Sequence, residues 1–465
     1  MLQNSKLKLP VLEAAIILIT IVAIISVSII MLGLNPHLPI IFSIMLLMVY
    51  GRLKGVSISE IEKGMINGAA SGLGAVYIFF FIGMLISSWM ASGTIPTLMF
   101  YGFELFSGLS FFFSVFVVCA IVGTCIGSAF TTAASIGVAF IGMATAMDTS
   151  LAITAGAIVS GAFLGDKMSP LSDTTNLASG TVGVPLFEHI KNMLWTTVPG
   201  FILTAVFFLM LSPSTGQKTG EVQVFLNALQ DNSYIGFVPL IPFVIVVVMA
   251  VCKISAIPTL SAGIVSSVMI AFVYNSSLTF SGMANILFSG FVLESPVEQL
   301  NTVLSRGGIE SMMFSISLIL LALGMGGLLF LLGIIPSLLG AIESSLTSVF
   351  RLIVATACTA IGINVFVGEQ YLSILLTGKT FENQYVKHGY DRKTLSRALE
   401  DCGTVINPLV PWGVAGVFIA GILGVPTIDY LPFAFFCLLC PVLSIVSGLT
   451  QIGIAKEEKK TKVVY

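Results

Sequence analysis

The segment at residues 165–176, GDKMSPLSDTTN, sets two aspartates, a lysine, a proline and several hydroxyl groups between apolar runs. Two neighbouring carboxylates can hold either a proton or a metal cation, and hydroxyl and amide oxygens are ligands that hard cations prefer. Binding one of two ions at a single site is the minimum chemistry of an ion exchanger. The predicted ion-binding or proton-exchanging residues of this segment are Asp166, Lys167, Ser169, Ser172, Asp173, Thr174, Thr175 and Asn176.

Within this set, we expect the exchanged cation to bind at Asp166 and Asp173. Lys167 is expected to tune the protonation of the two aspartates, or to pair with one of them when that cation is absent. The hydroxyl and amide oxygens would complete the coordination. A charge at the bilayer centre costs about 3 kcal/mol on insertion scales, so these charges must be paired, hydrated or functional.

Pro170 should break the helix that carries this segment, because proline lacks an amide proton and clashes with the preceding turn. The flanking apolar runs, 151–164 and 177–186, are each too short to span a bilayer. Broken backbone at membrane depth is tolerated only where it is buried in protein or lines a water-filled cavity. An ordinary polar loop at the membrane surface is the alternative interpretation.

The composition predicts an integral membrane protein of all-α class. Of the 465 residues, 56% are hydrophobic and 9% are charged, whereas a soluble chain carries about a quarter charged residues. The first apolar segment, residues 11–32, is interpreted as an uncleaved helix rather than a signal peptide. The seven cysteines lie in apolar segments and are interpreted as core residues, so no cofactor is predicted.

The C-terminal half of the chain repeats motifs of the N-terminal half at an offset of about 240 residues. SGTIPTL at 92–98 matches LGIIPSL at 332–338, and SGTVGVP at 179–185 matches AGILGVP at 420–426. SPL at 169–171 matches NPL at 407–409. Discontinuous segments at corresponding positions of two halves indicate the binding site of a secondary transporter.

The second repeat therefore contributes further candidate residues. Glu400 and Asp401 open the segment DCGTVINPLVP, although both could be surface charges beside Arg397. The side-chain oxygens of Thr404 and Asn407 are expected to face the segment at 165–176. The alternative for Asn364 and Asn407 is that their amides only satisfy backbone groups. The second-repeat candidates are Glu400, Asp401, Thr404 and Asn407, with Asn364 and Glu369 as weaker candidates.

Loop charges indicate that the two halves are inverted. The loop after the second helix carries Arg52, Lys54 and Lys63, whereas its counterpart at 275–310 is mainly acidic. Both termini are basic and are expected on the cytoplasmic side. The predicted organisation is a first inverted repeat at 1–211, an extracytoplasmic linker at 212–233, a second inverted repeat at 234–452 and a basic cytoplasmic tail at 453–465.

Each half is expected to contain about five transmembrane helices, broken helices and a re-entrant hairpin. The hairpin arms of the first half are predicted at 111–126 and 133–147, separated by GSAFTT. Those of the second half are predicted at 349–361 and 365–376, separated by GIN at 362–364. Two ordinary crossings are the alternative for each pair.

Three segments resemble the NhaC-type Na+/H+ antiporter family. They are GDKMSPLSDTTNLA at 165–178, GEQYLSILLTGKTF at 368–381 and SRALEDCGTVINPLVPWGVAGVF at 396–418. The resemblance implies a bacterial inner-membrane transporter that exchanges Na+ for H+, with inverted repeats, re-entrant hairpins and, in many members, a homodimer. The cation expected at Asp166 and Asp173 would then be Na+. Some members of the wider family exchange malate and protons for lactate and Na+, and others have been linked to amino-acid transport.

The sequence thus predicts a secondary active Na+/H+ exchanger of the bacterial plasma membrane that works by alternating access. An organic-acid antiporter is the alternative, with a small carboxylate as a further substrate. A channel and an intramembrane enzyme are disfavoured, the latter because no nucleophile with a base and no clear set of metal ligands occurs. The sequence contains no GxxxxGK[ST] loop and no basic patch with interleaved aromatic residues. We therefore expect neither a nucleotide nor a nucleic acid as a partner.

Overall fold

The computed structural model of the chain describes residues 5–106, 110–212, 219–342 and 348–456. These ranges are helical apart from loops and one isolated bridge between Tyr390 and Lys456. The first half contains α1 (Val11–Ser26), η1 (Val27–Met31), α2 (His37–Leu53), α3 (Ile58–Ala70), α4 (Leu73–Ala91), α5 (Thr94–Phe106), α6 (Phe111–Ile126), α7 (Ala129–Thr132), η2 (Ala133–Gly137), α8 (Val138–Ala146), α9 (Leu151–Met168), α10 (Asp173–Thr181) and α11 (Leu186–Leu211).

The predicted linker contains α12 (Thr219–Asn232), and its residues 213–218 lie outside the described ranges. The second half contains η3 (Val238–Leu240), α13 (Ile241–Val251), α14 (Ala256–Tyr274), α15 (Phe280–Ser289), α16 (Glu298–Leu304), α17 (Ile309–Leu331), α18 (Ile334–Ile342), α19 (Val349–Val367), α20 (Gln370–Lys387), α21 (Arg392–Leu399), η5 (Glu400–Thr404), η6 (Asn407–Leu409), α22 (Val414–Leu423), α23 (Thr427–Tyr430), η7 (Leu431–Phe433) and α24 (Phe435–Thr450).

The helices have the length and exposure pattern of a multi-pass membrane protein. Eight helices in the described ranges are long and apolar enough to cross a bilayer, or up to ten if each of two bent helix pairs is one span. Large apolar side chains such as Ile19, Val206 and Met269 are exposed on α1, α11 and α14. An apolar exterior of this kind is stable in lipid and not in water. The all-α membrane fold is therefore confirmed.

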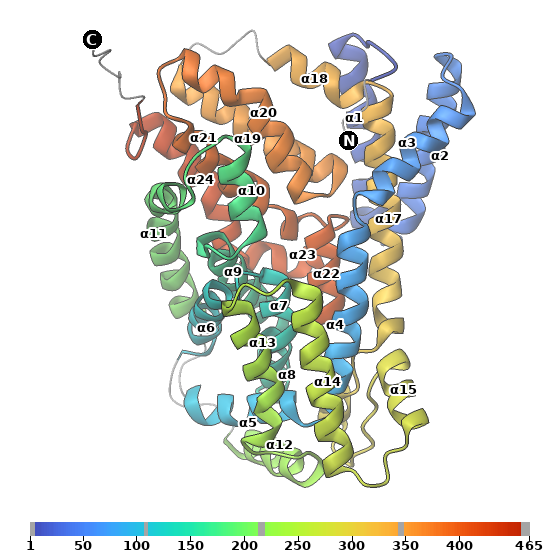
Figure 1. Cartoon of the computed structure of the whole chain (residues 1–465), viewed down its shortest axis with the longest axis vertical. Coiled ribbons are helices and arrows are strands. Elements are labelled where there is room, and N and C mark those ends of the chain that lie inside the picture. The colour runs from blue at the N-terminus through green and yellow to red at the C-terminus, as the bar shows by residue number, and fades with distance from the viewer. Residues whose placement is uncertain (1–4, 107–109, 213–218, 343–347, 457–465) are drawn as a thin grey trace.

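Two helical hairpins point toward the interior of the molecule. α18 and α21 both lie at the upper end in Figure 1, so α19 and α20 between them descend and return, and they pack against each other. α6 and the continuous stretch α7–η2–α8 form the other hairpin, and α8 packs against α5 and α12 at the lower end. Each tip is a left-handed glycine followed by a helix-capping residue, Gly127–Ser128 and Gly368–Glu369.

Equivalent elements of the two halves lie at opposite ends of the molecule. The short helices α5 and α18, which carry the matching IPT and IPS motifs, are at the lower and upper ends of the long axis (Figure 1). Gly93 and Gly333, which precede them, both have left-handed backbone. Inverted halves require such a placement, although the internal symmetry itself stays a prediction.

Both ends of the described chain lie at the same end of the long axis. The backbone N–H of Lys6 donates to the carbonyl of Leu331 beside α18. The opposite end of the chain, at Lys456, forms its bridge with Tyr390 at the end of α20. α18 and α20 are both at the upper end in Figure 1. This agrees with termini on one side of the membrane, and which side that is stays a prediction.

The predicted break at 362–364 in the second hairpin is wrong. α19 continues through Gly362 and Asn364 and ends at Gly368, whose φ is 77°. A glycine inside a helix costs only about 1 kcal/mol relative to alanine and need not end it, whereas a left-handed residue does. In the first hairpin the break falls at Gly127, inside the predicted segment GSAFTT.

Replacing Gly127 with alanine is expected to destabilise the first hairpin tip by about 1–3 kcal/mol because of the left-handed backbone, with a further penalty from crowding. A Cβ there would lie 2.6 Å from the Cβ of Leu171. The thermal stability of the purified protein in detergent measures the effect. Gly340→Ala is the matched control, since nothing lies within 4 Å of that position. Equal melting temperatures for the two variants would contradict the prediction.

Candidate ion-binding site

A cavity of about 740 Å³ lies where the two hairpin tips meet the break between α9 and α10. Its walls include Ser128 and Glu369 from the tips, and Asp166 and Asp173 from either side of the break. α7, α9 and α22 lie near the middle of the long axis (Figure 1). Charged side chains from two broken regions are therefore brought to one internal space.

The break between α9 and α10 follows from local sequence. α9 ends at Met168, and Ser169 is extended with φ −81° and ψ 130°, as expected for a residue before proline. Ser172 then caps α10 by accepting a hydrogen bond from the backbone N–H of Thr175 at 3.4 Å. The Thr175 hydroxyl donates to the carbonyl of Lys167 at 3.0 Å, which ties the two helix segments together.

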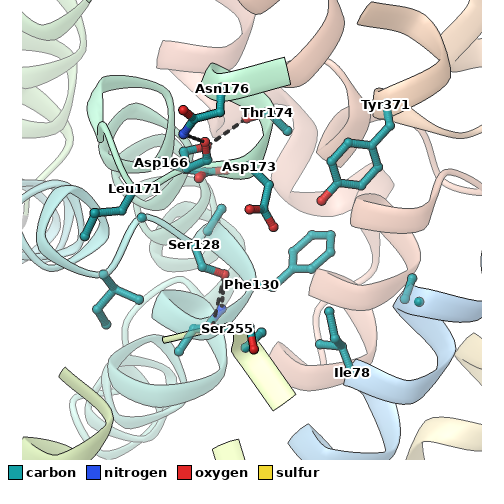
Figure 2. Close-up of a pocket in the computed structure, with 18 of the residues that line it drawn as sticks. Ile78, Ser128, Phe130, Asp166, Leu171, Asp173, Thr174, Asn176, Ser255 and Tyr371 are labelled. Atoms are coloured by element: carbon teal, nitrogen blue, oxygen red, sulfur yellow. Dashed lines mark hydrogen bonds between the residues drawn. The ribbon is translucent and has the colours of Figure 1, made fainter. Parts of the chain in front are cut away.

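The two aspartates differ in their surroundings. Asp166 is 6% exposed, and its carboxylate lies against the Ser172 hydroxyl and the backbone N–H of Ala129. Asp173 is exposed to the cavity and makes no hydrogen bond or ion pair within the described chain. Figure 2 shows its carboxylate pointing into open space toward the rings of Phe130 and Tyr371. Asp173 is therefore free to bind a cation.

Three helix N-termini face this cavity. Their capping residues are Ser128 at α7, Ser172 at α10 and Glu369 at α20, and all three line the cavity. One carboxylate oxygen of Glu369 accepts from the backbone N–H of Leu372 at 2.7 Å. Helix N-termini carry partial positive charge and favour negative groups. They offset part of the cost of gathering three carboxylic acids in one place.

The donor set fits a hard monovalent cation. The oxygens include the two aspartate carboxylates, the hydroxyls of Ser128 and Thr174, and the amide oxygen of Asn176, whose Nδ2 donates to the carbonyls of Pro170 and Ser172. No group of three or more His, Cys, Asp or Glu side chains that could hold a metal ion occurs in the described ranges. Neutral oxygens and water would therefore have to complete a cation site.

The comparisons with known proteins agree with this architecture. The profile of the Na+/H+ antiporter family matches residues 161–452, which include the broken helix and the second hairpin. A protein named Na+/H+ antiporter NhaC from Alkalihalophilus pseudofirmus is 44% identical over 94% of this chain and 95% of its own.

The chain belongs to the Na+/H+ antiporter family.

Two further relatives come from Bacillus subtilis, one with the same name and one with a different name. A Na+/H+ antiporter NhaC from Bacillus subtilis is 39% identical and covers 96% of this chain and all of its own. A protein named malate-2H+/Na+-lactate antiporter from the same organism is 34% identical and covers 95% of each chain. The resemblance to NhaC-type antiporters is thus confirmed, with lower identity to an organic-acid antiporter.

The cavity of this antiporter receives only some of the predicted site residues. Those that line it are Asp166, Ser172, Asp173, Thr174 and Asn176 from the first repeat and Glu369 from the second. Those that do not are Lys167, Ser169, Thr175, Asn364, Glu400, Asp401, Thr404 and Asn407. The expectation that Thr404 and Asn407 face the two aspartates is therefore wrong for this conformation.

The expected pairing of Lys167 with Asp166 or Asp173 is also wrong. The Lys167 ammonium donates to Asp401, and both side chains are 0% exposed. Successive residues of a helix point about 100° apart, so Asp166 faces the cavity while Lys167 faces away from it on another side of α9. The pair joins the broken segments of the two halves within the protein interior.

The amides of Asn364 and Asn407 hold the second broken segment together. Asn364 donates to the carbonyl of Gly403 at 2.6 Å, and Asn407 donates to Asn364 at 2.8 Å. The Asn407 oxygen accepts from the backbone N–H of Ala415 at 2.7 Å, in the first turn of α22. In this structure the two amides therefore satisfy backbone groups, which is the alternative role considered for them from the sequence.

Tyr371 and Lys253 are among the cavity residues that the sequence analysis does not single out. Tyr371 follows Glu369 at the second hairpin tip, and Lys253 lies between α13 and α14 with φ 62°. Lys253 carries a signal that could have revealed it, because α13 with its preceding 3-10 turn is too short to span a bilayer and Lys253 is a lone cation at its end.

Proposed function

We propose that this protein exchanges Na+ for H+ across the bacterial plasma membrane as a secondary active transporter. The observation that carries the proposal is the internal cavity in which Asp166 and Asp173 flank a broken helix. Two relatives that match nearly the whole chain are named Na+/H+ antiporters. Their names and the donor set of the cavity support the same substrate ions.

In the proposed mechanism, Na+ enters the cavity and binds the unpaired Asp173 carboxylate together with Asp166. Hydroxyl oxygens of Ser128 and Thr174 and cavity water replace part of its hydration shell. Bound Na+ disfavours a proton on carboxylic acids near it, and a bound proton on such an acid disfavours Na+. The two ions therefore compete, and exchange follows when the occupied cavity opens alternately to the two sides.

The proposed organisation places the two inverted halves at 1–211 and 234–452, with the linker at 212–233 outside the cell and both termini in the cytoplasm. The positions of α5 and α18 at opposite ends of the molecule support inversion. In alternating access, the hairpin and broken helix of one half of the chain then move relative to those of the other half. In this proposal the chain catalyses no covalent reaction.

Proteoliposomes that enclose a pH dye test this function. Purified protein is expected to move protons when Na+ is added outside, and not when choline replaces Na+. Li+ and K+ added in the same way define the ion selectivity. A signal equal to that of protein-free liposomes under all cations would overturn the proposal.

A specific observation favours a second candidate, an organic-acid antiporter. Lys253 lines the cavity, which is large enough for a small carboxylate as well as Na+. A lysine ammonium is a suitable partner for a carboxylate anion, and one relative is named a malate-2H+/Na+-lactate antiporter.

If this candidate holds, Lys253→Gln is expected to lower the uptake of labelled malate or lactate about tenfold, because a hydrogen bond to a charged group contributes about 1.5–3 kcal/mol. Uptake into proteoliposomes with an outward Na+ gradient measures the effect. Wild-type uptake no greater than that of empty liposomes would exclude organic-acid transport.

A further inference from the structure

A buried polar cluster lies behind the cavity, on the far side of α9. At its centre Asp401 binds the Lys167 ammonium through Oδ1. Thr196 on α11 donates to the same oxygen at 3.1 Å, and Ser444 on α24 donates to Oδ2 at 2.7 Å. A carboxylate with three donors, one of them charged, is stable as an anion in the interior. Asp401 is therefore committed to a structural ion pair.

The preceding residue, Glu400, is in the opposite situation. Its side chain is 0% exposed, and neither carboxyl oxygen has a hydrogen-bond partner in the described part of the chain. The hydroxyl of Thr404, in the same π-helical turn, lies beside this carboxyl group but makes no hydrogen bond of normal geometry. A buried carboxylate without donors is costly, whereas a protonated carboxyl group is neutral. The geometry therefore favours a proton on Glu400 in this conformation.

The charged groups around Glu400 connect it with the cavity. η5, which carries Glu400 and Asp401, packs against α9 and α10 on either side of the break, and α9 carries Asp166 and Lys167. Arg397, one turn earlier, is directed elsewhere and donates to the carbonyl of Gly453 and the hydroxyl of Ser447. Because Lys167 and Asp401 neutralise each other, Asp166 is the charge near Glu400 that changes when a cation binds in the cavity.

We propose that Glu400 carries the exchanged proton, at a site separate from the cavity where Asp166 and Asp173 bind Na+. The inference rests on the proposed Na+/H+ exchange and divides its two ions between different carboxylates. π-helical turns such as η5 occur frequently at functional sites.

The coupling follows from charge balance. With the cavity empty, the negative charge of Asp166 opposes ionisation of Glu400, which keeps its proton. Na+ beside Asp166 neutralises that charge, so Glu400 can give its proton to water that reaches it as the occupied cavity opens, and the neighbouring Thr404 hydroxyl can donate to the carboxylate that remains. One positive charge has entered the cavity and one has left Glu400. Departure of Na+ on the other side of the membrane reverses the step.

Glu400→Gln tests the proposal, because glutamine keeps the shape and remains neutral. Two assays on the same proteoliposomes are compared: Na+-driven proton movement, and exchange of radioactive Na+ for unlabelled Na+ at equal concentrations on both sides. Glu400→Gln is expected to lower proton movement about tenfold or more, while Na+ for Na+ exchange is retained. Glu188→Gln, an exposed acid on α11 paired with Lys393, is the control and should retain both activities.

Each other outcome has a defined meaning. Proton movement retained by Glu400→Gln would overturn the proposal, and so would loss of both activities in a variant that elutes from a sizing column like wild type. Wild-type protein that fails both assays would instead refute the proposed function. These results distinguish the two failures.

A measurement on unaltered protein covers the case in which the variant does not fold. Dicyclohexylcarbodiimide reacts with protonated carboxylic acids in apolar surroundings, and mass spectrometry locates the modified residue. We expect Glu400 to be modified in choline buffer and to be protected by Na+. No modification of Glu400, or modification that is the same with and without Na+, would contradict the proposal.

Discussion

Replacing Asp173 with asparagine is expected to lower Na+-driven proton movement by about 30-fold or more at subsaturating Na+, since removing one partner of a close charge pair costs about 2–5 kcal/mol of binding free energy. Asp173 makes no hydrogen bond or ion pair within the described chain, so the substitution leaves no group without its partner. The pH-dye assay in proteoliposomes measures the flux.

The matched control is Glu188→Gln, which removes an acidic group of the same charge from the exposed N-terminal turn of α11. It should transport like wild type. Asp166→Asn should impair transport as severely as Asp173→Asn, but with some loss of stability because Asp166 is buried against Ser172. If Asp173→Asn exchanges Na+ for protons at the wild-type rate, the assignment of the cavity is wrong.

Breaking the buried ion pair is expected to have the largest effect on stability. Lys167→Met leaves the Asp401 carboxylate in the interior without its cation, and removal of one partner of a buried pair costs about 3–5 kcal/mol. Unfolding in detergent mixtures of increasing denaturing strength measures the free energy of unfolding. The same chemistry predicts a comparable loss for Asp401→Asn, because the buried Lys167 ammonium then lacks its anion and the amide has only one oxygen to accept from Thr196 or Ser444.

The double variant Lys167→Met with Asp401→Asn isolates the interaction. It should be more stable than Lys167→Met alone, since no unpaired carboxylate remains, and the difference from additivity is the coupling energy. The exposed pair Lys393–Glu188 supplies the control cycle, and its coupling should be about 1 kcal/mol or less. Strictly additive losses at 167 and 401 would show that the two charges do not interact.

Several features of this protein are local and could be derived from the chain itself. The scarcity of charge requires a lipid-facing exterior, and Pro170 with Ser172 imposes the break between α9 and α10. The paired motifs ending in GVP place left-handed glycines, Gly183 and Gly424, at equivalent points. Each of these depends on residues within a few positions of one another, so sequence patterns report it.

The site could be predicted in part for the same reason. Asp166 and Asp173 belong to the break, and their position beside the cavity follows from it. Glu369 is only a weaker candidate in the sequence, because a single glutamate among apolar residues gives no information about which groups lie opposite it in the folded protein. The tertiary structure places it at a hairpin tip opposite the aspartates.

What only the tertiary structure decided are the contacts between distant segments. Lys167 and Asp401 are separated by 234 positions, and no spacing rule selects that partner over the aspartates beside it in sequence. The direction of each side chain around α9 and the packing of α11 and α24 against it determine the pairing. The same packing leaves the Glu400 carboxyl group without a hydrogen-bond donor. The sequence could not predict this, because chain connectivity specifies the neighbours of a residue along its helix but not the groups that surround it in space.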